Sequence, residues 1–132
     1  MHPVIGRLHR ATNAHDVDAI AACFAPDYRN TTPVHPARGF TGRDQVRRNW
    51  TQILGAVGDL RADVLATAVD GDAIWTEWEH RGTRRDGSEH LVRGVVIFEV
   101  RDDLIRAARF YLEPVDAAQE DVEDALRRQV RA

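Results

Sequence analysis

The amino-acid sequence predicts an α+β fold in which a strongly bent, mainly antiparallel sheet wraps around about three N-terminal helices, with a further helix at the C-terminus. In the first half, apolar residues recur at helical spacing up to about residue 57. After Gly58 the period changes to strand-like alternation for more than fifty residues, and turn signals divide this half into consecutive strands. A bent sheet must bury its apolar face, and the helices supply that cover.

The composition is that of an ordinary globular chain. Its 132 residues suit one domain with a single core, and no run approaches the roughly 20 apolar residues of a membrane helix. The net charge of −3 is spread along the chain, so we expect neither a nucleic-acid nor a membrane partner. The single cysteine, Cys23, and the lack of a signal-peptide pattern at the N-terminus favour a cytoplasmic location.

Two helices are expected before residue 26. Pro3 suits the first turn of a helix that ends near Ala14. Asp16 is then the expected N-cap of a short second helix, whose apolar stripe includes Phe24 and which Pro26 ends. These two helices should meet at a tight turn.

A short extended segment and a loop lead to the third helix. Residues 28–32 should be extended, and the loop at 33–42 is rich in glycine and proline and long enough to shape a pocket mouth. The helix expected at 43–57 carries Trp50 on its apolar face.

The second half predicts an antiparallel meander with strands at residues 60–68, 74–81, 89–100 and 104–113. In the first strand, the apolar residues at even-numbered positions from Leu60 to Ala68 alternate with more polar neighbours. Because strand side chains alternate, the other three strands should share one inward face. Its expected members are Ile74, Thr76, Trp78, His80, Val92, Gly94, Val96, Phe98, Phe110 and Leu112.

The opposite face of the meander mixes apolar, aromatic and oppositely charged side chains. Such a mixture suits an interface between two copies of the chain, where an arginine of one copy can meet a glutamate of the other. The alternative is a solvated sheet face. The outward residues are Trp75, Glu77, Glu79, Arg81, Arg93, Val95, Ile97, Arg109 and Tyr111.

The inward face indicates a small-molecule pocket, in which His80 is the most obvious titratable group. His80 is a candidate general base, or alternatively a hydrogen-bonded histidine without a catalytic role. Tyr28 and Asn30 are candidate catalytic groups that orient ligand or water, or else they satisfy nearby backbone groups. Candidate ligand contacts, each of which could instead be a core or loop residue, are Trp78, Phe98, Phe110, Trp50 and His35.

We expect no cofactor and no metal. The six histidines show neither His-x-His nor Glu-x-x-His spacing on a suitable element. The sequence also has no glycine-rich phosphate loop and no nucleophile elbow, and its only serine, Ser88, falls in an expected turn.

Residues 116–132 predict a fourth helix, because carboxylates come early and arginines late, as the helix dipole favours. Its apolar stripe is thin and consists of Val115, Val122, Leu126 and Val130. We expect this helix to dock on the body or on a partner subunit, the alternative being a solvated tail.

Several stretches, taken in order, resemble one known family. They are residues 13–20, 24–28, 40–46, 98–105 and 109–111. Their order and separations resemble the SnoaL-like branch of the nuclear transport factor 2-like superfamily over residues 1–114, with residues 115–132 as a helical extension. The resemblance implies a cone-shaped α+β barrel with an internal pocket, and a homodimer formed through the outer sheet face. The family hosts many unrelated activities, so its fold does not define a reaction.

Ketosteroid isomerases of this superfamily use a tyrosine and a carboxylic acid to bind an oxyanion, and an aspartate to remove a proton. The corresponding positions here are Leu8, Val96 and Thr32, which cannot perform those roles. The resemblance therefore argues against isomerisation by that particular mechanism.

Limonene-epoxide hydrolases resemble the chain at Tyr28 and Asn30, residue types that help to hold the attacking water in those enzymes. Their catalytic arginine falls at Trp78, and their two aspartates fall at His80 and Phe110, so the hydrolase triad is absent. SnoaL-type cyclases use a histidine or aspartate base in the cavity, a role that His80 or His35 could fill.

Three hypotheses follow for the function. The first is an enzyme that acts on an apolar, oxygenated or cyclic small molecule by acid–base chemistry, as an isomerase, cyclase or hydrolase, with His80 as the base. The second is a protein that binds such a molecule without turnover. The third is an interaction domain whose cavity has no ligand.

Overall fold

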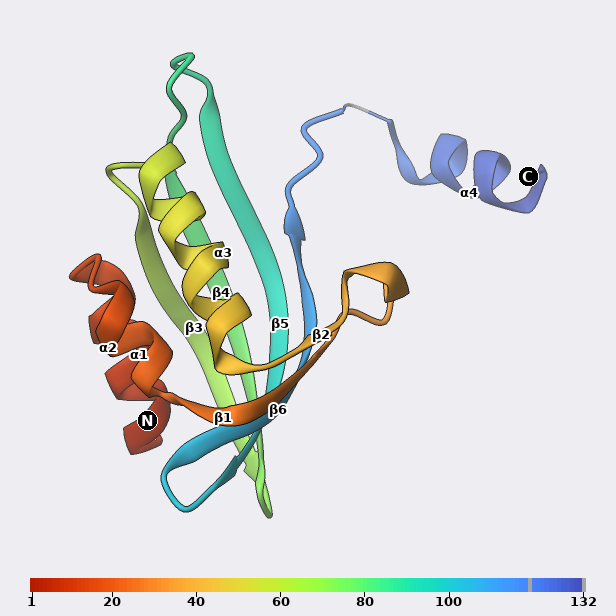
Figure 1. Cartoon of the computed structure of the whole chain (residues 1–132). Coiled ribbons are helices and arrows are strands. Elements are labelled where there is room, and N and C mark those ends of the chain that lie inside the picture. Colours follow the sequence, from red (N-terminus) through yellow and green to blue (C-terminus); the bar gives the residue numbers. More distant parts are fainter. Residues whose placement is uncertain (119, 132) are drawn as a thin grey trace.

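Six strands form one bent sheet, and three helices cover its concave side (Figure 1). The computed structural model describes residues 1–118 and 120–131. The elements are α1 (Pro3–Asn13), α2 (Val17–Ala22), β1 (Phe24–Thr31), the 3₁₀ helix η1 (Pro36–Arg38), β2 (Phe40–Thr41), α3 (Arg43–Ala56), β3 (Arg61–Asp70), β4 (Ala73–Thr83), β5 (Glu89–Arg101), β6 (Leu104–Pro114) and α4 (Val122–Arg131).

The strand order in the sheet is β2-β1-β6-β5-β4-β3. Strands β3 to β6 form the expected antiparallel meander. Strand β1 then joins the sheet parallel to β6 and antiparallel to β2. Within the described residues β2 and β3 are edge strands, so the sheet curves without closing. The predicted α+β class, with a bent and mainly antiparallel sheet, is confirmed.

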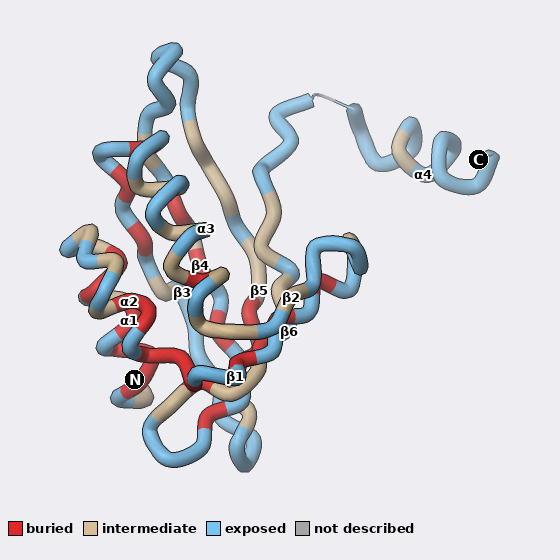
Figure 2. Tube along the Cα trace, viewed as in Figure 1, coloured by how far each residue is buried: buried red, intermediate tan, exposed pale blue. Residues whose placement is uncertain are grey.

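The hydrophobic core lies between the first three helices and one face of the sheet. From the helices it receives Ile5 and Leu8 of α1, Ile20 of α2 and Val46 of α3, which pack with apolar residues of β1, β4, β5 and β6. Figure 2 shows buried segments in α1, α2 and the middle of the sheet, while the hairpin tips and most of α4 are exposed. Burying a large apolar side chain contributes roughly 1.5–3 kcal/mol, so these contacts supply most of the stabilisation of the layered arrangement.

The second helix is shorter than the sequence predicts. The Asp16 side chain caps it as expected, accepting a hydrogen bond of 3.0 Å from a backbone N–H of the first turn. The helix ends at Ala22, and Phe24, which was expected on its apolar stripe, instead begins β1 opposite Ile105 of β6. The extended segment expected at 28–32 is therefore part of a longer strand. Pairing with β6 is non-local, so the local periodicity around Phe24 could not indicate it.

The predicted alternation along β3 holds only for the first half of the strand. Between Val64 and Ala66 the register with β4 shifts, so that Leu65 is the extra residue of a β-bulge. After the bulge, Ala66 and Ala68 lie opposite outward residues of β4 and are exposed, whereas Ala62 before the bulge is buried. One inserted residue exchanges the two faces of a strand, and apolar periodicity alone did not reveal it.

Side chains from the N-terminal segment hold the free edge of β3. The Asn13 amide donates to the carbonyl oxygen of Ala62 at 2.9 Å and accepts from the Ala62 N–H at 2.7 Å. His9 Nε2 lies 2.8 Å from the same carbonyl oxygen, and His15 Nε2 lies 2.8 Å from that of Leu60. These contacts fix α1 against β3 and so position the helices over the concave side.

The C-terminal helix begins at Val122, later than the sequence predicts, and lies apart from the sheet (Figure 1). Residues 119 and 132 of the predicted helix are outside the described residues. Val122, Leu126 and Val130 are exposed, so the described part of the chain shows no docking of this stripe on the body. Docking on a partner subunit stays a prediction. Neither α4 nor any other helix in the described ranges is long and apolar enough to cross a membrane.

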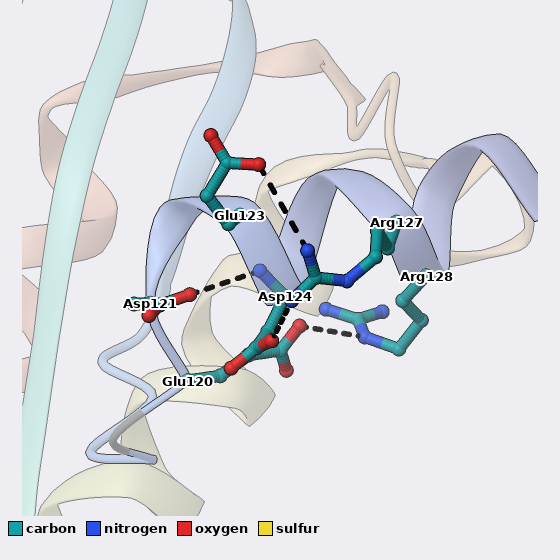
Figure 3. A network of polar contacts seen from close by, with 6 residues as sticks. All are labelled: Glu120, Asp121, Glu123, Asp124, Arg127 and Arg128. Atoms are coloured by element: carbon teal, nitrogen blue, oxygen red, sulfur yellow. Dashed lines mark hydrogen bonds and ion pairs between the residues drawn. The ribbon is translucent and has the colours of Figure 1, made fainter.

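The charged residues of α4 and of the segment before it pair with one another (Figure 3). Arg127 contacts Asp124 and also lies 3.9 Å from Glu123, while Arg128 pairs with Glu120 at 3.0 Å. Exposed pairs of this kind contribute up to about 1 kcal/mol each. They support the helix locally without attaching it to the sheet.

Strands β5 and β6 approach closely at Gly94, which pairs with Leu112. Gly94 has φ +150°, and a Cβ there would collide with the carbonyl oxygen of Tyr111. On its other side Gly94 pairs with Trp78 of β4. Glycine at this position therefore allows the close approach of β6 beside the Trp78 side chain.

Replacing Gly94 with alanine should lower the free energy of unfolding by more than about 3 kcal/mol, or prevent folding, because the clash relaxes only if β5 and β6 separate. Gly55→Ala is the matched control: a Cβ at Gly55 of α3 meets no atom within 4 Å, and alanine should leave stability unchanged or raise it by up to about 1 kcal/mol. Urea unfolding followed by circular dichroism measures both variants. Wild-type stability in Gly94→Ala would contradict this account.

Candidate functional site

One face of β4 is buried and the other is largely exposed, as the alternation predicts. The buried residues are Ile74, Thr76, Trp78 and His80. Strand β5 places Val92 opposite His80 and Val96 opposite Thr76, and β6 places Phe110 opposite Val96. The three strands therefore share the predicted inward face.

This face, together with β1 and α3, borders a cavity of about 380 Å³. A smaller recess of about 30 Å³ lies next to it, with room for about one or two waters, and shares His80, Trp50 and Phe110 with the larger space. The walls are mainly apolar with a few polar groups, an arrangement typical of small-molecule sites. The polar groups of the lining include Tyr28, Asn30, Thr32, His80 and His90.

His80 presents a neutral imidazole to the cavity. The residue is 9% exposed, and its ring lies 5.9 Å from that of Trp50 and 5.7 Å from that of Trp78 between centroids. Burial, and to a lesser extent the nearby His90, lowers the pKa of His80 to about 4. Within residues 1–118 and 120–131 no group hydrogen-bonds the His80 ring, yet no buried polar atom is sealed without a partner. Its ring nitrogens therefore open onto the cavity that it lines.

Alternate residues at the end of β1 form a polar wall. The Tyr28 hydroxyl donates to Asn30 Oδ1 at 2.8 Å, and Asn30 Nδ2 donates to Thr32 Oγ1 at 3.4 Å. Burial raises the pKa of the Tyr28 hydroxyl, which stays a protonated donor. Hydrogen bonds that run in one direction polarise each other. In the described part of the chain, the Thr32 hydroxyl hydrogen and the second Asn30 N–H have no acceptor, so they are available to an oxygen of a ligand.

Trp78 contributes surface to the site rather than a hydrogen bond. Its Nε1–H donates to Thr76 Oγ1 at 2.7 Å, and the Thr76 hydroxyl donates to the Val96 carbonyl oxygen at 2.7 Å. The indole N–H is therefore satisfied within the sheet. The predicted aromatic contacts that line the recess are Trp50, Trp78, Phe98 and Phe110, and Trp50 and Phe110 also line the larger cavity.

His35 is not among the residues that line the cavity. Its Nε2 lies 3.2 Å from the carboxylate of Glu113, and an Arg38 nitrogen lies 3.8 Å from the same carboxylate. Glu113 and Arg38 line the cavity, and the sequence reasoning did not include either of them. His35 therefore contacts the lining through Glu113, and a direct contact between His35 and a ligand stays a prediction.

Three further polar residues of the cavity were not predicted as site residues: Thr32 after β1, Asn49 of α3 and His90 of β5. His90 comes two residues before the inward Val92, so extending the predicted alternation by one step would have included it. Burial, and then the charge of Arg84, lowers the pKa of His90. Asn49 accepts a hydrogen bond of 2.7 Å from Gln45. No pattern in the sequence distinguishes Asn49 from an ordinary polar residue on the solvated face of a helix.

The polar groups of the cavity are arranged for proton transfer at a ligand atom that lies next to a ligand oxygen. His80 supplies a neutral base, and the Asn30 and Thr32 side chains supply hydrogen-bond donors that can stabilise negative charge on oxygen. Among the described residues, no three histidine, cysteine or carboxylate side chains are grouped so as to hold a metal ion.

Comparisons with known proteins agree with the fold. A sequence model described as a SnoaL-like domain matches residues 5–108, whereas no curated protein matches the chain. A Catenulispora acidiphila protein of ketosteroid isomerase-like fold, solved with trimethylamine, has a TM-score of 0.73 at 15% identity, covering 84% of this chain and 86% of that one.

Two further solved structures are similar. An LEH-like epoxide hydrolase of M. tuberculosis has a TM-score of 0.70 at 19% identity, covering 97% of this chain and 87% of that one. A candidate SnoaL-like polyketide cyclase of Jannaschia has a TM-score of 0.70 at 18% identity, covering 83% and 82%. At these identities the likeness shows a common fold alone.

Replacing His80 with glutamine should make the stability of the protein less sensitive to acid. The ordinary pKa of histidine is 6.5, whereas folded His80 has a pKa of about 4, so between these values the unfolded state binds a proton that the folded state does not. Acid therefore favours unfolding in this range. From pH 7 to pH 4.5 the wild type should lose roughly 2 to 3 kcal/mol more free energy of unfolding than His80→Gln. Urea unfolding at each pH measures the difference.

Phe110→Leu is the control for this measurement, because it alters the same cavity and keeps the imidazole. Its free energy of unfolding should follow the pH dependence of the wild type. If His80→Gln and the wild type lost stability in parallel, the folded protein would not be holding His80 neutral.

Proposed function

Because this chain belongs to the SnoaL-like domain family, the assignment that its sequence predicted, we propose that its cavity binds an apolar, oxygen-bearing small molecule from which His80 removes a proton. One observation carries this proposal: a neutral imidazole that no described residue hydrogen-bonds faces a mainly apolar cavity of about 380 Å³. The names of two structurally similar proteins, an LEH-like epoxide hydrolase and a candidate polyketide cyclase, describe enzymes of small molecules. These names support the same class of function for this chain.

The proposed reaction begins at a carbon next to a carbonyl group. A ring nitrogen of His80 accepts the proton, and the electron pair of the C–H bond moves into the carbonyl group to form an enolate. Donors from Asn30 and Thr32 bind the enolate oxygen. His80 then returns the proton to the same or a conjugated carbon, which would complete an isomerisation. A base of pKa about 4 is weak but sufficient, since ketosteroid isomerases use one of about 4.6.

Binding without turnover is the second candidate function. The low pKa of His80 favours it, because a weak base accepts a proton from carbon only when the developing negative charge is well stabilised. The two candidates share the ligand and differ in whether the imidazole of His80 takes part in a reaction.

Proton removal can be tested with 2-tetralone, a compact bicyclic ketone, by following deuterium exchange at its α-carbon by NMR in D₂O. The wild type should accelerate exchange. The acceleration by His80→Gln should be smaller by a factor of about 100 to 10,000, the usual contribution of a general base. His15→Gln is the matched control: His15 contacts the Leu60 carbonyl oxygen and does not line the cavity, so this variant should accelerate exchange as much as the wild type does.

Binding is measured separately from turnover. Of the three tryptophans, Trp50 and Trp78 border the cavity and its recess while Trp75 faces outward, so a Trp75→Phe background reports occupancy through tryptophan fluorescence. Tight binding with exchange no faster than in buffer would support the non-catalytic candidate. No fluorescence change with 2-tetralone or related cyclic ketones would contradict both.

We also propose that two copies of the chain associate through the outer sheet face. Trp75 is 45% exposed there, and Tyr111 is exposed as well. Glu79 is held between two arginines, at 2.7 Å from Arg81 and 2.6 Å from Arg93. An aromatic group surrounded by charges of both signs suits a two-fold interface, because each patch can meet its own copy.

Trp75→Glu should weaken this association by about 30-fold or more, corresponding to the loss of roughly 2 kcal/mol at a central aromatic residue. Val34→Glu introduces the same charge at an exposed loop residue and should leave the association unchanged. Sedimentation equilibrium over a range of concentrations measures both variants. A wild-type protein that is monomeric at every concentration would exclude the interface.

A further inference from the structure

An open groove of about 820 Å³ adjoins the cavity between the end of α3 and the hairpin that joins β4 to β5. The groove and the cavity share two lining residues, Ile53 and His90. The groove differs from the cavity in its charge, since Arg84 and Arg85 of the hairpin also line it.

Both guanidinium groups are held by neutral groups of the backbone. Arg85 donates to the Gly55 carbonyl oxygen at 2.9 Å, and Arg84 donates to the Glu89 carbonyl oxygen at 2.8 Å. In residues 1–118 and 120–131, neither guanidinium has a carboxylate within 4.0 Å.

Among the described residues that line the groove, Asp86 is the only acidic one, and its carboxylate accepts hydrogen bonds from the backbone N–H and the hydroxyl of Ser88. Arginine has five N–H donors in a planar fork. The contacts above use few of them, so both side chains keep donors for an anion and are partly preorganised.

We propose that this groove is a subsite for the anionic end of a ligand whose apolar body lies in the cavity. The ligand is then an amphiphilic acid: a ring or chain that fills the apolar space, joined to a carboxylate or phosphate group that Arg84 and Arg85 bind. The inference rests on the proposed function, because it requires that the cavity hold an apolar body.

A matched pair of fluorescent probes tests the subsite. N-phenyl-1-naphthylamine is neutral, and 8-anilinonaphthalene-1-sulfonate is the same molecule with a sulfonate added. The anionic probe should bind the wild type about 3- to 10-fold more tightly, as expected for two exposed ion pairs, and this advantage should decrease as salt is added. The double variant Arg84→Gln with Arg85→Gln should lose the advantage while its affinity for the neutral probe stays the same.

The control is the double variant Arg29→Gln with Arg61→Gln, which changes the net charge equally at two exposed positions that do not line the groove. It should keep the preference for the anionic probe. Equal affinity of the two probes for the wild type, or a preference that survives in the Arg84 and Arg85 variant, would overturn the subsite alone. Failure of the neutral probe to bind would overturn the proposed function, and the subsite with it.

Competition distinguishes the two anion types. 1-Naphthaleneacetate and 1-naphthyl phosphate carry the same ring system with a carboxylate or a phosphate, and each can displace the bound neutral probe. Tighter binding of one than of the other identifies the preferred group, and loss of that preference in the Arg84 and Arg85 variant supports the subsite. If both competed equally well in the wild type and in that variant, the subsite would be excluded.

Discussion

Every layer of this molecule depends on the burial of one face of β4. The residues on that face must be removed from water, so β5 and β6 extend the face and the first three helices cover it. The cover is incomplete, because a cavity of about 380 Å³ lies between α3 and the strands β1, β4, β5 and β6. Side chains that border the cavity lack protein neighbours on that side, so most of the dispersion contacts of the fold come from the close-packed core elsewhere.

The same burial gives the polar groups their chemical character. Removal from water keeps His80 uncharged and keeps the Tyr28 hydroxyl protonated. The donors Asn30 and Thr32 are placed by the end of a strand rather than by a long loop, so their spacing follows the strand repeat. The Trp78 N–H is satisfied inside the sheet by Thr76. The cavity thus combines broad apolar walls with a small number of polar groups that have no hydrogen-bond partner among the described residues.

Local patterns in the sequence predicted what local physics determines. The meander from β4 to β6 was predicted in register because short turns and strict alternation leave little freedom, and this was enough to place His80 beside the aromatic residues of the site. Non-local effects were missed. The parallel pairing of β1 with β6 drew Phe24 out of a helix, and the bulge at Leu65 reversed the faces of β3. His35 could not be placed because loop geometry, not periodicity, directs it to Glu113.

The contact between Asn13 and β3 has a consequence for solubility. Edge strands expose unpaired backbone groups that can recruit a strand from another molecule and start aggregation. At Ala62 both backbone groups are occupied by the Asn13 amide, and at Leu60 the carbonyl oxygen is occupied by His15. An incoming strand finds neither donor nor acceptor at Ala62. The side chains that orient the helices therefore also keep the backbone at the start of this edge from pairing with a strand of another molecule.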